Sequence, residues 1–217
     1  RMPAAFAAAG IFYAALLALM QRNLRRLLAY AVVSHTSVLV IGLFSLGTAA
    51  FQGAVMLSAN FGLAIAGLLF MTGCVYGRTR TTDLDKLGGL FDRLPMIGAA
   101  FFVAGLSIVG MPGTPGFDAV HLMLEAAIAR FGALVTIAAA LGNVAAAAFL
   151  LWAFQRAFLA PASAEATAKI PPATWPERVI AGVVILVLLG AGFYSEPWLE
   201  VTDAPLTALA ARFGFGH

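Results

Sequence analysis

Four ionisable side chains lie in apolar parts of this sequence, where they could carry protons. His35 lies in the middle of one long apolar run. Asp118, His121 and Glu125 follow the motif GMPGTPGF. On a helix, His121 and Glu125 lie at about 300° and about 340° from Asp118, so the three side chains share one face. Imidazole titrates near neutral pH, and burial can move the pKa of a carboxyl group toward that range. Such a row of side chains is suited to proton relay.

The same residues also have structural interpretations. Asp118 can cap the helix that follows the motif, because an acidic side chain near a helix start binds free amides and favours the helix dipole. Capping does not explain His121 or Glu125, for which a polar pathway is the favoured hypothesis. His35 can instead hold two helices together by hydrogen-bonding a group on a neighbouring helix. The sequence leaves both interpretations of His35 open.

The composition is that of an integral membrane protein. Hydrophobic residues make up 62% of the 217 residues and charged residues only 11%, whereas roughly a quarter of a soluble domain is charged. The net charge of +3 comes from basic residues in short loops, which indicate topology rather than a nucleic-acid partner. A single cysteine, Cys74, excludes a disulfide framework and a cysteine-based metal motif. No cofactor, metal or catalytic motif is present, so we expect none of these.

Six apolar runs predict an all-α fold with about six transmembrane helices, because one crossing needs about 20 apolar residues. The runs cover residues 3–20, 27–46, 51–76, 94–129, 131–154 and 179–194. The fourth run is too long for one straight crossing, and its prolines and glycines predict a discontinuous helix broken at Gly110–Gly116. Non-helical backbone at membrane depth needs protein or water to satisfy its polar groups, so the break indicates a functional site. Asn60 and Asn143 are buried amides that could support it.

The basic residues predict the orientation in the membrane. Loops 21–26, 77–93 and 155–178 are expected in the cytoplasm, because basic residues concentrate on that side. These loops carry ten of the thirteen Lys and Arg residues: Arg22, Arg25, Arg26, Arg78, Arg80, Lys86, Arg93, Arg156, Lys169 and Arg178. Both termini are then expected on the non-cytoplasmic side of a bacterial inner membrane.

Three long stretches of the sequence carry a family resemblance. They are GIFYAALLALMQRNLRRLLAYAVVSHTSVLVIGLFSL, AFQGAVMLSANFGLAIAGLLFMTGCVYGRTRTTDLDKLGGLFDRLP and GLSIVGMPGTPGF, in unbroken order within about residues 8–160. Together they resemble the antiporter-like proton-translocating subunits of respiratory complex I, in the subunit M (chain 4) branch, and of Mrp-type antiporters. Members of that family are longer and contain two inverted helical repeats. The resemblance implies that residues 1–160 form the second, C-terminal repeat, 161–177 a cytoplasmic linker, and 178–217 the last transmembrane helix with a short interfacial tail.

The resemblance also implies roles for individual residues. In that family a central line of lysines, histidines and a glutamate passes protons along the membrane midplane. The histidine of a serine–histidine motif in this line matches His35, which follows Ser34, so the resemblance carries the pathway role over to His35. The family's discontinuous helix matches the break. Asn60 stands where a histidine is usual, and Val120 stands where the glutamate is usual.

These two departures leave two explanations. In one, His121 supplies a different exit path together with Asp118 and Glu125. In the other, the subunit has lost pumping and remains as a membrane scaffold. Position does not favour either explanation, since Val120 and His121 point about 100° apart on a helix.

Our first hypothesis is a proton-conducting half-channel within a larger complex I-like or antiporter-like assembly, for example a proton-translocating NADH:quinone oxidoreductase. This hypothesis implies other membrane subunits in the bilayer, one of which supplies the missing N-terminal repeat, and a soluble redox or large cytoplasmic subunit. The alternatives are a non-pumping scaffold that docks a soluble protein, and the membrane partner of an inorganic-carbon uptake complex.

Overall fold

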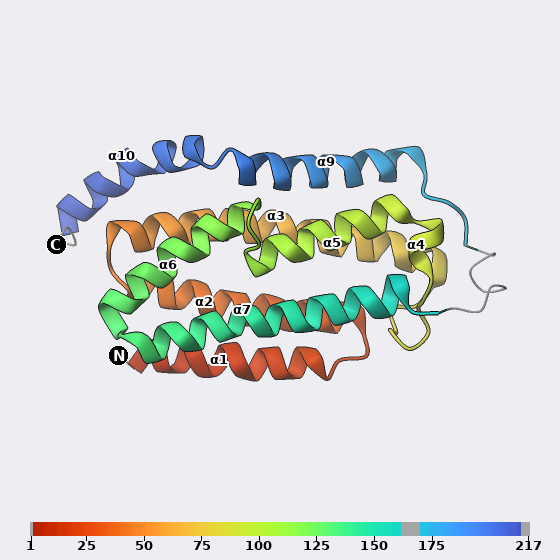
Figure 1. Cartoon of the computed structure of the whole chain (residues 1–217), viewed down its shortest axis with the longest axis horizontal. Coiled ribbons are helices and arrows are strands. Elements are labelled where there is room, and N and C mark those ends of the chain that lie inside the picture. The colour runs from red at the N-terminus through yellow and green to blue at the C-terminus, as the bar shows by residue number, and fades with distance from the viewer. Residues whose placement is uncertain (1, 162–169, 214–217) are drawn as a thin grey trace.

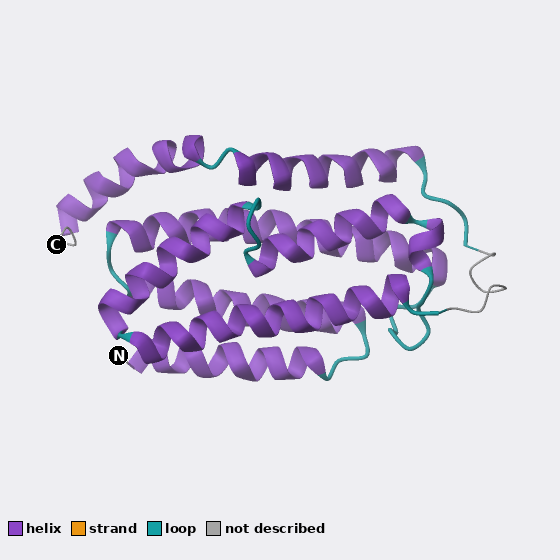
Figure 2. Ribbon diagram, in the orientation of Figure 1, coloured by secondary structure: helices purple, strands orange, loops and turns teal. Residues whose placement is uncertain are grey.

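The computed structural model describes residues 2–161 and 170–213, which form helices and no strand (Figure 2). The elements in chain order are α1 (Met2–Leu19), α2 (Leu24–Phe44), α3 (Thr48–Thr79), α4 (Leu90–Arg93), α5 (Pro95–Val109), α6 (Pro115–Phe131), α7 (Ala133–Phe154) with the π-helical extension η1 (Gln155–Leu159), α9 (Trp175–Phe193) and α10 (Glu196–Phe213). Five of these helices, α1, α2, α3, α7 and α9, are long and apolar enough to cross a membrane. The predicted all-α membrane fold is confirmed.

The sixth crossing is made by α5 and α6, which lie end to end (Figure 1). Residues 110–114 interrupt the helix there, and Gly110 and Gly113 have positive φ angles of 76° and 87°, which glycine adopts without strain. The predicted break is therefore present. It ends at Pro115 rather than at Gly116, because proline is well suited to the first turn of a helix.

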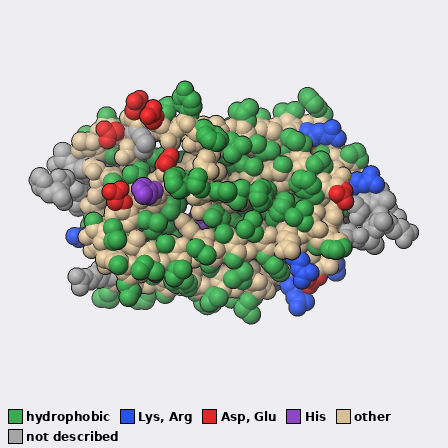
Figure 3. Space-filling model, viewed as in Figure 1, with side chains coloured by type: hydrophobic (Ala, Val, Ile, Leu, Met, Phe, Trp, Pro, Cys, Tyr) green, Lys and Arg blue, Asp and Glu red, His purple; other side chains and the backbone are tan. Residues whose placement is uncertain are grey.

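The helices run alternately in opposite directions, so the loops fall at two ends of the bundle (Figure 1). The end that carries residues 20–23, 80–89 and 160–161 is called the basic end here. Lys and Arg side chains gather at this end, and most of the visible Asp and Glu side chains lie at the other end (Figure 3). Lys169, one of the ten basic loop residues, lies outside the described residues.

The buried core forms two apolar clusters, one in each half of the bundle. The cluster toward the basic end includes Leu27, Phe101 and Phe149. The cluster toward the opposite end includes Val38, Leu57, Val120, Met123 and Ala139. The two clusters meet at the level of the break between α5 and α6, which is where a polar site can be enclosed.

An ion pair attaches α9 to the end of α3. The Arg78 Nη1 atom donates to Glu177 Oε1 over 2.8 Å, and the Arg78 side chain is only 9% exposed. Glu177 also accepts from the backbone N–H of Thr174 at 2.7 Å, which completes a capping box at the start of α9. The last crossing therefore begins at Trp175, inside the stretch 161–177 expected as a linker. Residues 162–169 of that stretch lie outside the described residues.

The Glu177→Gln variant is expected to lower the free energy of unfolding by about 1.5–3 kcal/mol, because it removes a charged hydrogen-bond partner from a buried guanidinium. The matched control is Asp85→Asn, since Asp85 pairs with Arg22 at 3.2 Å but both side chains are exposed, at 41% and 81%. That change should cost less than about 1 kcal/mol. Thermal unfolding in detergent measures both, and equal effects would contradict the anchoring role of Glu177.

The C-terminal segment, expected as a short interfacial tail, is a long helix. It forms α10, a helix of 18 residues that contains Pro205 and packs against α3. Alanine and leucine, which are strong helix formers, follow the proline and continue the helix. Residues 214–217 lie outside the described part of the chain.

Candidate functional site

The break between α5 and α6 leaves backbone carbonyls without their helical partners. In a continuous helix the carbonyl of Ile108 would accept from the N–H of residue 112, but Pro112 has no N–H. His35 on α2 lies 2.8 Å from this carbonyl through its Nε2 atom. A carbonyl oxygen can only accept, so Nε2 carries the hydrogen and donates it. The side chain of His35 thus supplies the donor that the proline lacks.

This hydrogen bond fixes which nitrogen of His35 remains free. In a neutral imidazole one nitrogen carries a hydrogen and the other is an acceptor, so Nδ1 is the acceptor here. The side chain is buried, at 1% exposure, and its ring stacks on Phe61 with centroids 5.2 Å apart. Nδ1 has no hydrogen-bond partner among the described residues. Nδ1 is therefore the ring atom at which His35 would take up a proton.

Asn60 on α3 binds a second carbonyl of this turn, that of Ser107, which also accepts from the Gly110 N–H at 3.3 Å. The Nδ2 atom of Asn60 donates to the Ser107 carbonyl at 3.1 Å, while the Ser107 hydroxyl donates back to Asn60 Oδ1 at 2.6 Å. The N–H of Met111, which would normally bind this carbonyl, bonds Leu106 instead. Side chains from two neighbouring helices therefore satisfy the last turn of α5.

Gly116 allows α6 to begin directly beside these groups. A Cβ atom at this position would overlap the Ser107 carbonyl oxygen and would lie 2.9 Å from Asn60 Nδ2. Glycine is therefore required here by close approach of backbone to backbone, and not by a special dihedral angle.

Four buried polar side chains define what we call the polar layer: His35, Asn60, Ser107 and Asn143. They come from α2, α3, α5 and α7 and are between 0% and 9% exposed. None belongs to either apolar cluster. On α2, α3 and α7 the flanking core residues are divided between the two clusters, whereas on α5 both Ala104 and Ile108 belong to the cluster toward the basic end. Asn143 Oδ1, like His35 Nδ1, is buried without a partner in the described residues. The layer crosses the bundle at the level of the helix break.

The structure places Asp118, His121 and Glu125, called the α6 row here, away from the polar layer. His121 and Glu125 are exposed and Asp118 is half-buried, whereas the packed face of α6 carries Ala119 and Val120. The three polar side chains share one face, but that face points out of the described bundle. Asp118 lies in the first turn of α6, where its charge favours the helix dipole.

Val120, unlike the row, lies on the packed face beside the break. A Cβ at Gly110 would meet Val120 Cγ2 at 3.4 Å. The position where the resemblance implies a glutamate is therefore beside the helix break but apolar. The described residues bring together no group of three His, Cys, Asp or Glu side chains that could hold a metal ion.

Ser107 and Phe61 were not singled out from the sequence. Ser107 could have been predicted from the sequence. It lies five residues before Pro112, in the helical turn whose carbonyls lose their partners. Phe61 carries no such signal, since any apolar residue is plausible in a membrane helix.

Comparisons with known proteins point to one family. Residues 2–147 match the sequence profile described as NADH:quinone oxidoreductase/Mrp antiporter, TM. NADH-quinone oxidoreductase subunit M of Pseudomonas aeruginosa is 34% identical over 205 residues, which are 94% of this chain and 40% of that protein. NAD(P)H-quinone oxidoreductase chain 4 of Acaryochloris marina is 32% identical over 93% of this chain and 39% of that protein. The chain thus spans about two fifths of the length of these relatives.

Solved structures agree with the observed fold. A chain of respiratory complex I from Thermus thermophilus has a TM-score of 0.79 and 27% identity, covering 93% of this chain and 43% of that one. A chain of the Mrp complex from Dietzia sp. has a TM-score of 0.84 at 19% identity, covering 94% and 46%, which supports the fold alone.

Proposed function

The chain belongs to the NADH:quinone oxidoreductase/Mrp antiporter family of membrane subunits, and on that premise we propose that it forms a proton-conducting half-channel within a larger energy-converting membrane assembly. The observation that carries the proposal is the ring of His35. Its Nε2 atom is held by the Ile108 carbonyl, and its Nδ1 atom is buried with its lone pair free. A side chain held in this way can take up a proton without losing its place beside the break.

The polar layer supplies the surroundings that such a transfer needs. Asn60 and Ser107 exchange two hydrogen bonds across α3 and α5, and Asn143 Oδ1 offers a further acceptor on α7. Ionisable and polar groups inside a membrane protein are costly and mark proton or ion pathways. A path that enters this layer can pass through His35 at the level of the break.

We assign the exit to the row on α6. Asp118 lies in the first turn after the break, and His121 and Glu125 follow on the same face toward the end opposite the basic end. Because this face is exposed on the described chain, the proposal requires that a neighbouring membrane segment or subunit covers it. The relatives support this arrangement, since they are longer than this chain.

Orientation and partners belong to the same proposal. The basic end is assigned to the cytoplasm by the positive-inside rule, and both ends of the chain to the other side of a bacterial inner membrane. The assembly would include further membrane subunits, one providing an N-terminal repeat, and a soluble redox or large cytoplasmic subunit. The name of one structural relative, respiratory complex I at 27% identity, supports membership of a multi-subunit complex.

A second function, a non-pumping scaffold, is favoured by a different observation. Asn60 and Val120 do not titrate. The two hydrogen bonds between Asn60 and Ser107 are those expected of a side chain that only caps the end of α5. In that case the hydrogen bond from His35 to Ile108 serves only to hold α2 against α5.

Neutralising the α6 row separates the two functions. The triple variant Asp118→Asn, His121→Gln, Glu125→Gln is expected to reduce proton flux by roughly 10²-fold, the smaller end of what a positioned proton-transfer group contributes. Proton uptake is measured in membrane vesicles that contain the intact assembly, and native gels check that it has formed. The matched control is Glu200→Gln, an exposed acid on α10. A scaffold predicts unchanged flux in both variants.

A further inference from the structure

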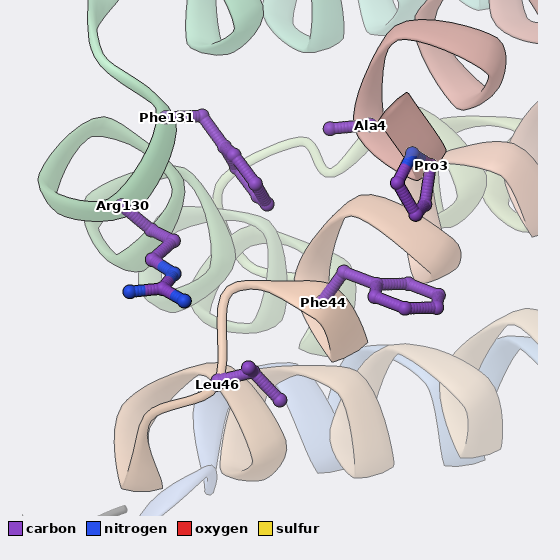
Figure 4. Close-up of a pocket in the computed structure, with 6 residues that line it drawn as sticks. All are labelled: Pro3, Ala4, Phe44, Leu46, Arg130 and Phe131. Atoms are coloured by element: carbon purple, nitrogen blue, oxygen red, sulfur yellow. The ribbon is translucent and has the colours of Figure 1, made fainter. Parts of the chain in front are cut away.

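A cavity of about 340 Å³ lies at the end of the bundle opposite the basic end. It is lined by three separate segments: the start of α1, the end of α2 with the turn that follows it, and the last turn of α6 (Figure 4). The lining residues are Pro3, Ala4, Phe44, Leu46, Arg130 and Phe131. The cavity is separate from the polar layer, so a ligand bound in it need not take part in proton transport.

Among the described residues, the cavity is lined by one cationic side chain and five apolar ones. Figure 4 shows the Arg130 guanidinium directed toward the space between Leu46 and Phe131. Arg130 forms no ion pair with any acidic side chain in the described part of the chain. The other five lining residues carry no charge and no polar side chain. The occupant that fits must therefore combine an anionic group with an apolar body.

The location narrows the class of occupant. The cavity lies where α1 and α7 begin and α2 and α6 end, which is the depth of the lipid headgroups for helices that span a bilayer. Phe44 is 47% exposed beside it and can lie along an acyl chain. The first turns of α1, α3 and α7 contain no acidic residue, so none of these helices offsets its own positive dipole with an acidic side chain.

We propose that this cavity binds the phosphate headgroup of an anionic phospholipid, with the phosphate on Arg130 and the first part of an acyl chain against Phe44 and Pro3. A guanidinium matches two phosphate oxygens at once. A free phosphate ion would make the contact with Arg130 but would leave the apolar wall uncovered, so the lipid is the better occupant.

Native mass spectrometry of the full protein in its purified assembly tests the proposal, with phosphatidylglycerol, phosphatidylcholine and inorganic phosphate as probes. The unmodified protein should retain phosphatidylglycerol in preference to phosphatidylcholine. The Arg130→Gln variant should bind phosphatidylglycerol roughly fivefold more weakly or worse, as expected for the loss of one basic contact near the membrane surface. Arg130→Lys should retain part of the affinity. The matched control Arg93→Gln removes an exposed arginine at the basic end and should leave binding unchanged.

Three results would overturn the proposal. In one, Arg130→Gln and Arg93→Gln bind phosphatidylglycerol equally. In another, inorganic phosphate displaces the lipid from the unmodified protein at concentrations that leave the Arg130→Gln variant unaffected, which makes the site one for free phosphate. In the third, no phospholipid is retained in an Arg130-dependent way, which is the result expected if another protein segment fills the cavity.

Discussion

Replacing His35 with glutamine is expected to abolish most proton transport while the chain still folds and assembles. The amide of glutamine can still donate to the Ile108 carbonyl, so the last turn of α5 keeps its partner. Glutamine does not titrate, so the side chain at this position can no longer take up a proton. Removing one positioned proton-transfer group typically costs 10²- to 10⁴-fold, and we expect the proton flux of membrane vesicles to fall by about this factor.

Two further variants make this result interpretable. Ser34→Ala removes a neighbouring buried hydrogen bond, from Ser34 Oγ to the Ile11 carbonyl at 3.2 Å, without touching a titratable group, and should keep the flux close to that of the unmodified protein. His35→Leu removes both the acceptor and the donor, and leaving the Ile108 carbonyl unsatisfied should also cost about 1–3 kcal/mol of stability. If His35→Gln transports as well as Ser34→Ala, the histidine is only a structural cap.

The Gly116→Ala variant is expected to cause the largest loss of stability. The added Cβ overlaps the carbonyl oxygen of Ser107 and approaches Asn60 Nδ2 to 2.9 Å. The first of these is backbone and cannot rotate away, so α6 must shift relative to α5 and the bonds between Asn60 and Ser107 must lengthen. Overpacking typically costs about 1–3 kcal/mol, and we expect the upper end of that range because the clash is with backbone. The loss is measured as a lower thermal unfolding midpoint in detergent.

Gly62→Ala provides the control for that measurement. Gly62 lies within α3 with no heavy atom within 4 Å of a built Cβ. Alanine is the better helix former, by roughly 0.5–1 kcal/mol, so this change should be neutral or slightly stabilising. Similar unfolding midpoints for the two variants would show that the approach of α6 to α5 is looser than the structure indicates.

The break and its position could be predicted because proline and glycine act locally. Pro112 removes one specific backbone donor, and this follows from sequence alone. Which side chain replaces that donor could not be predicted without a resemblance, since His35 is 73 residues away from Ile108 in the chain. The direct contact depends on how α2 packs against α5, and a helical pattern does not determine that.

The α6 row illustrates the opposite case. Helical spacing correctly predicted that Asp118, His121 and Glu125 share a face, because that relation is local. It did not predict that the face points out of the bundle, since the packed face is set by the apolar residues Ala119 and Val120 and by the helices they meet. The length of α10 was underestimated for a related reason. The tail contains residues that favour a helix, but its sequence alone does not reveal the contact with α3 that stabilises that helix.

The measurement that tests the central claim most directly is ¹⁵N nuclear magnetic resonance of the histidine rings in the intact assembly. Proton flux reports on the whole assembly, whereas a ring nitrogen reports on the residue itself. The chain contains only three histidines, and the His35→Gln variant assigns the signal of His35. We predict a hydrogen on Nε2 and an unprotonated Nδ1 that exchanges magnetisation with water protons. A hydrogen fixed on Nδ1, or a ring with no contact to water, would contradict the assignment of His35 as a proton carrier.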